Sequence, residues 1–145
     1  MNHLRLDAIL PDSVRPQDGT TEPNPKDILI TGATGFVGSY LLAKLMATTE
    51  ATLHCLVRGE SREAAKQRLV NALSTKGLWT EAWAARLAAH QGDLESDALG
   101  LDNETGRHLA ATIDTIYHCG AHVSFAASYS HLNRDFHFLS EVPIW

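Results

Sequence analysis

Three glycines spaced three residues apart form the part of this chain with the clearest chemical use. The run TGATGFVG places Gly32, Gly35 and Gly38 between an apolar segment, residues 28–30, and a helical pattern that starts at residue 36. A strand, a glycine turn and a helix in this order let a diphosphate approach the backbone, and the helix N-terminus offers it unpaired N–H groups. Although three glycines alone can form a simple tight turn, this context predicts a dinucleotide-binding loop.

Two arginines follow at the distance where the ribose of a dinucleotide is expected. Arg58 stands about twenty residues beyond the glycine loop and ends the apolar segment 51–57. At this strand end an acid holds the ribose hydroxyls of NAD, whereas a cation holds the 2′-phosphate of NADP. Arg58 therefore favours NADP, although Glu60 lies close by. Arg68 either folds back towards the same phosphate or is a solvated charge on its helix.

Asp93 and the segment HCGA are further candidates at the same edge of the sheet. Asp93 ends a predicted strand, and its carboxylate either accepts a hydrogen bond from an adenine amino group or caps a turn. His118, Cys119 and His122 have compact spacing, but no fourth ligand follows at a zinc spacing, so we expect no metal site. We interpret HCGA as a turn in which small residues let the ribose pass close to the backbone.

One Tyr-x-x-x-Lys pair occurs in the chain, formed by Tyr40 and Lys44. A lysine one helical turn from a tyrosine lowers the pKa of the phenol and can make it a catalytic proton donor. This pair lies on the helix that starts at the glycine loop, away from the nicotinamide, and its spacing is also that of any helix face. We therefore assign it no catalytic role.

The elements that must position these residues alternate between strand and helix. Apolar runs predict strands at residues 28–31, 51–57, 90–93 and 113–117, and helical spacing predicts helices at residues 36–48, 61–76, 81–89, 103–111 and 128–140. Ser61 is expected to cap its helix and Gly77 to end it. The order predicts an α/β fold, a Rossmann-like parallel sheet with helices on both faces. Because such sheets have roughly six strands, we expect this one to be truncated after about four.

Composition limits the remaining functions. Residues 1–25 are rich in proline and predict a linker or lead-in, and residues 26–145 predict the N-terminal part of an NAD(P)-binding Rossmann domain. The formal charge of −5 argues against a nucleic-acid surface. No apolar run approaches the roughly 20 residues of a membrane span, and no signal peptide is apparent. Two cysteines without a C-x-x-C pattern suit free thiols in the cytoplasm.

Taken together, these motifs resemble the thioester reductase domains of the extended short-chain dehydrogenase family, which end non-ribosomal peptide synthetases and carboxylic acid reductases. The resemblance covers residues 6 to 129 and rests on DILITGATGFVGSYLL, LHCLVRGES with AAKQRL, KGLW, QGDL and IDTIYHCGAHVSF. It implies NADP(H) as cofactor, and as partner a carrier protein whose phosphopantetheine thioester is reduced to an aldehyde or alcohol. The resemblance also assigns the pyrophosphate to Gly32, Thr34, Gly35, Phe36, Val37 and Gly38, the 2′-phosphate to Arg58 and Arg68, the adenine to Asp93 and Leu94, and the fourth-strand loop to Gly120 and Ala121.

The chain departs from this family at two places. Cys119 stands where the family commonly has asparagine, and the stretch after Tyr129 lacks the expected asparagine-valine and glycine-threonine pattern. The family's catalytic Tyr-x-x-x-Lys lies beyond residue 145, so we expect the chain alone to be inactive and to self-associate through an exposed sheet edge. The alternatives are a non-catalytic NADP(H)-binding or protein-interaction module, and the start of a sugar-nucleotide epimerase, which Arg58 disfavours.

Overall fold

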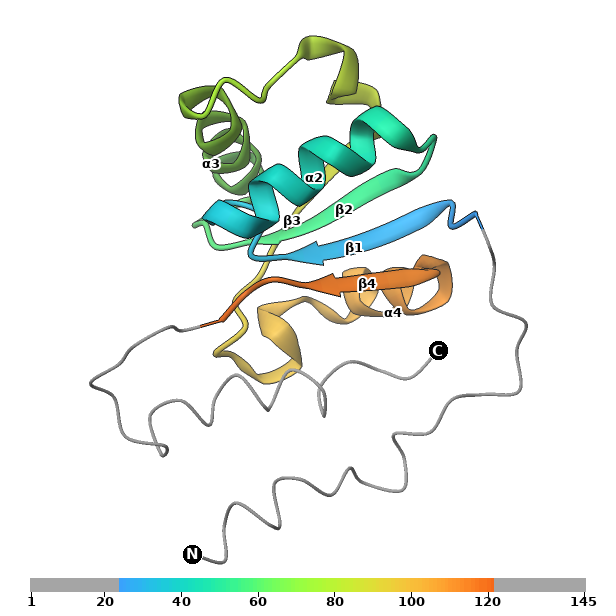
Figure 1. Ribbon diagram of the computed structural model, residues 1–145. Coiled ribbons are helices and arrows are strands. Elements are labelled where there is room, and N and C mark those ends of the chain that lie inside the picture. The colour runs from blue at the N-terminus through green and yellow to red at the C-terminus, as the bar shows by residue number, and fades with distance from the viewer. Residues whose placement is uncertain (1–23, 122–145) are drawn as a thin grey trace, which may run out of the picture.

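A parallel four-stranded sheet is the centre of the computed structural model, which describes residues 24–121 (Figure 1). Its elements are β1 (Asp27–Thr31), α2 (Phe36–Thr48), β2 (Thr52–Val57), α3 (Arg62–Thr75), the 3-10 helix η1 (Glu81–Arg86), β3 (Leu87–Gln91), the 3-10 helix η2 (Asp97–Gly100), α4 (Asn103–Thr112) and β4 (Thr115–His118). All neighbouring strands pair in parallel, in the order β3-β2-β1-β4. This confirms the predicted Rossmann-like α/β class, and the strand order changes direction between β1 and β4.

Helices cover both faces of the sheet, and the alternation of side chains along β1 explains how. α2 and α3 lie above the sheet in Figure 1, and α4 lies below it. Ile28 and Ile30 are completely buried in the core shared with α2 and α3, whereas Leu29 packs against Leu109 of α4. Because both faces are covered, β1 is a continuous apolar run rather than an alternating one.

The third strand begins earlier than its sequence predicts. Helical spacing predicts a helix at residues 81–89 and a strand at residues 90–93, but the helix ends at Arg86 and is a 3-10 helix. β3 pairs with β2 in register from Leu87 onward. The prediction of both elements is therefore wrong in its boundaries. Alanines at positions 88 and 89 favour helix locally, and pairing with β2 overrides that preference.

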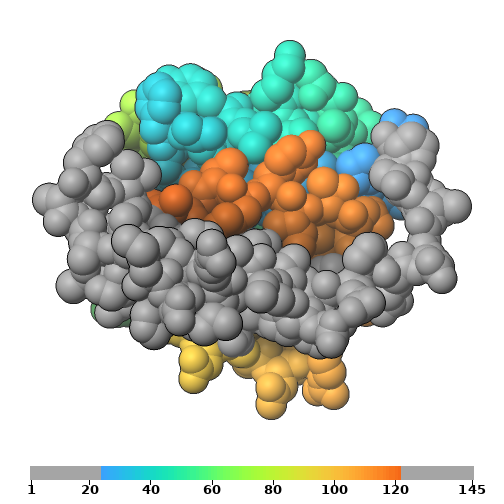
Figure 2. All heavy atoms as spheres, turned by 60° about the horizontal axis from the view of Figure 1, so that its bottom comes forward, coloured from blue at the N-terminus to red at the C-terminus, as the bar shows by residue number. Residues whose placement is uncertain are grey.

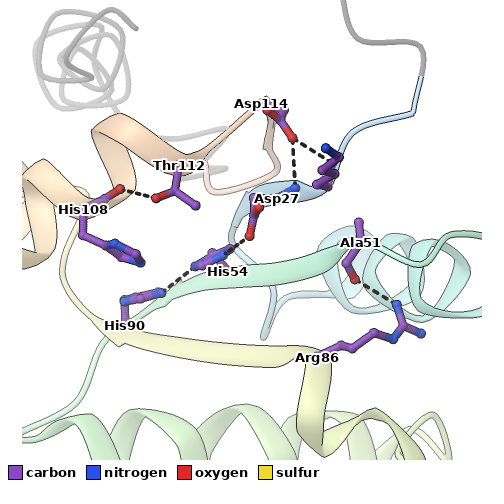
Figure 3. Close-up of polar contacts among 9 residues, drawn as sticks. Asp27, Ala51, His54, Arg86, His90, His108, Thr112 and Asp114 are labelled. Carbon is purple, nitrogen blue, oxygen red and sulfur yellow. Dashed lines mark hydrogen bonds and ion pairs between the residues drawn. The ribbon is translucent and has the colours of Figure 1, made fainter.

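Arg86 marks the point where the chain turns into β3. Its guanidinium donates to the carbonyl oxygens of Met46 at 2.9 Å, Thr49 at 3.1 Å and Ala51 at 2.8 Å, and Figure 3 shows the contact with Ala51. These carbonyls lie at the end of α2 and in the turn before β2. The side chain therefore satisfies backbone groups that the helix end leaves unpaired, and it ties the start of β3 to them.

Local signals at the ends of the other elements are confirmed. Ser61 caps α3, since its Oγ accepts a hydrogen bond from the Ala64 N–H at 3.1 Å. Gly77 follows the helix with φ of 68°, a conformation that suits glycine. The strand predicted at residues 113–117 is β4, shifted by one or two residues. The helix predicted at residues 128–140 and most of the lead-in lie outside the described residues.

The described part of the chain contains no helix that is long and apolar enough to cross a membrane.

Candidate functional site

A cavity of about 260 Å³ opens where the strands reach their carboxyl ends. Four segments contribute its wall: the glycine loop, the end of β2 with α3, the loop after β3 and the loop after β4. The lining residues are Gly32, Thr34, Gly35, Leu56, Val57, Arg58, Arg68, Gly92, Asp93, Leu94, Glu95, Cys119, Gly120 and Ala121. The carboxyl edge near the change in strand order is the usual ligand crevice of open α/β sheets.

The structure brings nine of the twelve predicted site residues to this cavity. These nine are Gly32, Thr34, Gly35, Arg58, Arg68, Asp93, Leu94, Gly120 and Ala121. Phe36, Val37 and Gly38 are not among the lining residues. Phe36 and Val37 are 74% and 65% exposed at the start of α2, where backbone N–H groups have no partner within the helix.

Gly32 is the glycine on which the loop depends most directly. Its φ is 67°, and its carbonyl accepts a hydrogen bond from the Gly35 N–H at 2.9 Å, which closes the turn. A Cβ at position 32 would lie 2.6 Å from the Cys119 carbonyl and from the Gly120 nitrogen. The loop after β4 therefore packs directly on Gly32, and the two walls of the cavity meet there. A Cβ at Gly38 would overlap the Gly32 carbonyl oxygen, so Gly38 serves packing within the loop.

No side chain of α2 caps the N-terminus of the helix or offsets the positive end of its dipole. Gly35 is the N-cap residue and makes no side-chain capping hydrogen bond, and the first turn contains no acidic residue. The unpaired N–H groups and the positive end of the helix dipole are thus left for an anion. This arrangement suits a phosphate or diphosphate group beside Thr34 and Gly35.

The two arginines lie together on another wall of the cavity. Arg68 extends back from α3, and its Nη1 donates to the backbone carbonyl of Arg58 at 3.3 Å. The Arg68 side chain thus folds back towards the end of β2 while it remains exposed, and its role towards a phosphate stays a prediction. Two arginines that line the same cavity suit a compact dianion such as a phosphate monoester.

Asp93 has the turn role that its sequence position predicts, and its role towards an adenine stays a prediction. Its Oδ1 accepts a hydrogen bond from the Glu95 N–H at 3.1 Å, which is an Asx turn, and the residue also lines the cavity. Gly92 precedes it at a point of close contact, because a Cβ there would overlap Leu56 and approach the Leu99 carbonyl to 2.7 Å. This backbone is therefore held close to the end of β2.

Thr31 and His118 hold the loop after β4, and the sequence did not indicate this. Thr31 is completely buried, and its Oγ1 accepts a hydrogen bond from the Gly120 N–H at 3.2 Å and lies 2.7 Å from His118 Nδ1. His118 is thus a partner of a buried hydroxyl. Within residues 24–121 no group of three or more His, Cys, Asp or Glu is arranged to hold a metal ion, and His122 lies outside that range.

The lining residues that are not among the twelve predicted site residues are Leu56, Val57, Gly92, Glu95 and Cys119. Each is a close neighbour in sequence of a predicted site residue, so a wider window around Arg58, Asp93 and Gly120 finds all of them. Cys119 is a free thiol in the cavity wall. Cys55 is also free, but it is buried in the core, and burial raises the pKa of its thiol so that it stays protonated.

A polar chain of three side chains crosses the face of the sheet that carries α4 (Figure 3). Asp27 Oδ1 lies 3.0 Å from His54 Nε2, and His54 Nδ1 lies 2.9 Å from His90 Nε2. The pKa of His90 is lowered to about 4, first by burial and then by electrostatic interaction with His54, Arg62 and His108, in that order. His90 is therefore neutral at pH 7, and it lies two residues before Gly92 in the cavity wall.

Figure 2 shows the molecule from the side of α4 and β4, both in orange, with α2 in cyan above them.

Comparison with known proteins places this site in a class. The model of an NAD-binding family, described as Male sterility protein, matches residues 30–136. A component of the linear gramicidin synthase of Brevibacillus parabrevis is 44% identical over 106 residues, which cover 73% of this chain and 2% of that protein. L-2-aminoadipate reductase from Saccharomyces cerevisiae is 34% identical over 150 residues, which cover 97% of this chain and 11% of that enzyme.

Solved structures agree with these relatives. The terminal R domain from the myxalamid PKS-NRPS biosynthetic pathway superposes with a TM-score of 0.81 at 31% identity, over 97% of this chain and 39% of that one. The reductase domain of a non-ribosomal peptide synthetase from Mycobacterium tuberculosis gives a TM-score of 0.67 at 31% identity, over 84% of this chain and 32% of that one.

The fold and site are thus those of an NAD(P)-binding domain of the Rossmann type. More narrowly, the chain belongs to the family of terminal reductase domains found in non-ribosomal peptide synthetases and carboxylic acid reductases, which confirms the resemblance seen in the sequence. It spans well under half the length of each of these relatives.

Proposed function

We propose that this chain is the NADP(H)-binding portion of a thioester reductase, whose substrate is an acyl chain carried as a phosphopantetheine thioester on a carrier protein. The product is an aldehyde or, after a second reduction, an alcohol. The choice of NADP(H) rests on one observation: two arginines, Arg58 and Arg68, line the cavity that the glycine loop also lines. The reductase relatives support the reaction class.

The residues present fit the cofactor at each of its groups. The diphosphate fits the N-terminus of α2, beside the glycine loop. At Gly32 this loop has no room for a Cβ, because the backbone after β4 packs against it. The 2′-phosphate fits Arg58 and Arg68, and the adenine fits beside Asp93. In this assignment the loop after β4 passes along the ribose that carries the nicotinamide. When bound, NADPH supplies a hydride, and in this proposal the residues of the cavity hold and orient the dinucleotide.

Cofactor preference tests this proposal. Calorimetric titration of the chain should show tighter binding of NADPH than of NADH. Arg58→Ala should weaken NADPH binding by about 10- to 100-fold, because a charged hydrogen bond to the phosphate is lost, and should leave NADH binding within about two-fold. Arg107→Ala is the matched control, since Arg107 is an exposed arginine on α4, across the sheet from α3. Equal affinities for the two cofactors, or equal effects of the two substitutions, would contradict the proposal.

We also propose that the 145-residue chain binds the cofactor without transferring hydride. Its single Tyr-x-x-x-Lys pair places Tyr40 on the exposed side of α2, 48% exposed and with its ring 5.1 Å from that of Phe36. Neither Tyr40 nor Lys44 is among the residues that line the cavity. NADPH absorbance at 340 nm should therefore stay constant when an acyl-pantetheine thioester is added. Steady oxidation of NADPH that depends on the thioester would refute this.

A further inference from the structure

Lys76 reaches the glycine loop from behind. Its Nζ donates to the carbonyl oxygen of Thr34 at 3.3 Å and to that of Ala72 at 3.1 Å. Thr34 belongs to the glycine loop and lines the cavity, whereas Lys76 does not line it. The ammonium group therefore contacts the backbone of the glycine loop without lining the cavity.

The backbone at the end of α3 fixes the position of Lys76. Its N–H donates to the Leu73 carbonyl at 3.2 Å, and the Leu78 N–H returns to the same carbonyl at 2.9 Å. Gly77, with φ of 68°, allows this closure. A lysine at a helix C-terminus commonly binds the last carbonyls, which accounts for the contact with Ala72. It does not account for the contact with Thr34, which lies 42 residues earlier in the chain.

The charge of Lys76 adds to a site that is already electropositive. The N-terminus of α2 carries no acidic residue in its first turn, and Arg58 and Arg68 line the same cavity as the glycine loop. An ammonium group within hydrogen-bonding distance of the loop raises the potential at the place that suits a diphosphate. The half-buried position of Lys76 reduces the screening of this charge by solvent.

We propose that Lys76 is a positioning residue for the diphosphate of the dinucleotide: it fixes the Thr34 peptide and places a positive charge behind the glycine loop. The inference rests on the proposed function only for the identity of the ligand. It separates the roles of the cations, because Arg58 acts on the 2′-phosphate, which NADPH alone carries, and Lys76 acts on the diphosphate, which NADPH and NADH share.

Titration of both cofactors against variants of the 145-residue chain tests this role. Lys76→Met should weaken NADPH and NADH by the same factor, about three- to ten-fold, and should flatten the dependence of affinity on salt. Lys76→Arg should keep the affinity within about two-fold, because it retains a charged donor. Lys66→Met, which removes an exposed lysine from the same helix, is the matched control for net charge and should leave both affinities unchanged.

Other results of these titrations would overturn the positioning role of Lys76. If Lys76→Met binds both cofactors as Lys66→Met does and only its melting temperature falls, Lys76 is a helix cap and the inference is overturned. If Lys76→Met weakens NADPH alone, the lysine serves the 2′-phosphate and the inference is again overturned. Should Lys76→Met fail to fold, Lys76→Gln replaces it, since the amide keeps a donor for Thr34 without the charge and should show the loss of salt dependence. If the unchanged chain binds neither cofactor, the proposed function is refuted. If the unchanged chain binds both cofactors and Lys76→Met binds them equally well, only the role of Lys76 is refuted.

Discussion

Mild acid should destabilise this domain through His90. When both rings are neutral, the contacts with Asp27 determine which ring nitrogen carries each proton. His54 donates from Nε2 to the Asp27 carboxylate, so its Nδ1 accepts a hydrogen bond from Nε2 of His90. A proton added to His90 places a charge in a site that is 7% exposed and faced by His54, Arg62 and His108. Folding therefore opposes protonation of His90.

The magnitude follows from the two pKa values. His90 has a pKa of about 4 in the folded chain, against an ordinary value of 6.5. Since the folded pKa is the lower one, the unfolded chain binds the extra proton first, and stability is lost as the pH falls from 6.5 towards 4. At about 1.4 kcal/mol per pKa unit, His90 removes about 2 kcal/mol of unfolding free energy between pH 7 and pH 5, and about 3 kcal/mol once the folded state is also protonated.

Urea unfolding at pH 7, 6 and 5 and constant ionic strength measures this loss. His90→Gln is the informative variant, because its side-chain amide can still donate towards His54 but does not titrate. The variant should be less stable than the unchanged chain at pH 7, and the difference between them should shrink by about 2 kcal/mol at pH 5. If the two chains lose the same free energy over this range, His90 is not a buried neutral histidine and the reasoning fails.

Three further outcomes can be checked on the same preparations. Gly32→Ala should lower the unfolding free energy by about 2 kcal/mol or more, because residue 32 has a positive φ and a new Cβ would meet backbone atoms. Gly106→Ala should raise it by up to about 1 kcal/mol, because the space around a new Cβ on α4 is open. Equal effects of the two substitutions would contradict the packing described. Arg86→Ala should lower it by about 2 kcal/mol by unpairing buried carbonyls, and Arg86→Lys should restore only part of this, as urea unfolding will show. Because Phe36 is 74% exposed and β4 pairs only with β1 within residues 24–121, the chain should self-associate with rising concentration; a sharp monomer in light scattering would refute this.

The strand–turn–helix unit around the glycine loop could be predicted because its signals are local. Gly32 needs its positive φ for a turn between adjacent elements, and Ser61 and Gly77 mark helix ends by contacts with residues a few positions away. The gathering of Arg58 and Asp93 at one cavity could also be predicted, since parallel strands present their carboxyl ends at the same edge.

The remaining features depend on contacts between distant segments. The start of β3 is set by Arg86, whose three acceptors lie 35 to 40 residues earlier, and nothing in the local run LAAH indicates this. The hydroxyl of Thr31 finds Gly120 across 89 residues, and Lys76 finds Thr34 across 42. The residue type shows which hydrogen bonds a side chain can make, but the folded structure determines which backbone group is its partner.

The contact between Gly32 and the loop after β4 has a consequence for the order of folding. The first wall of the cavity is complete in sequence by residue 38, but the wall that packs on Gly32 arrives with Cys119 and Gly120. β4 is the more distant in sequence of the two strands that pair with β1, and closing this long loop is entropically costly. A dinucleotide held as proposed would bind only the form in which β4 is docked, and it would thus shift the equilibrium away from forms in which β4 is undocked.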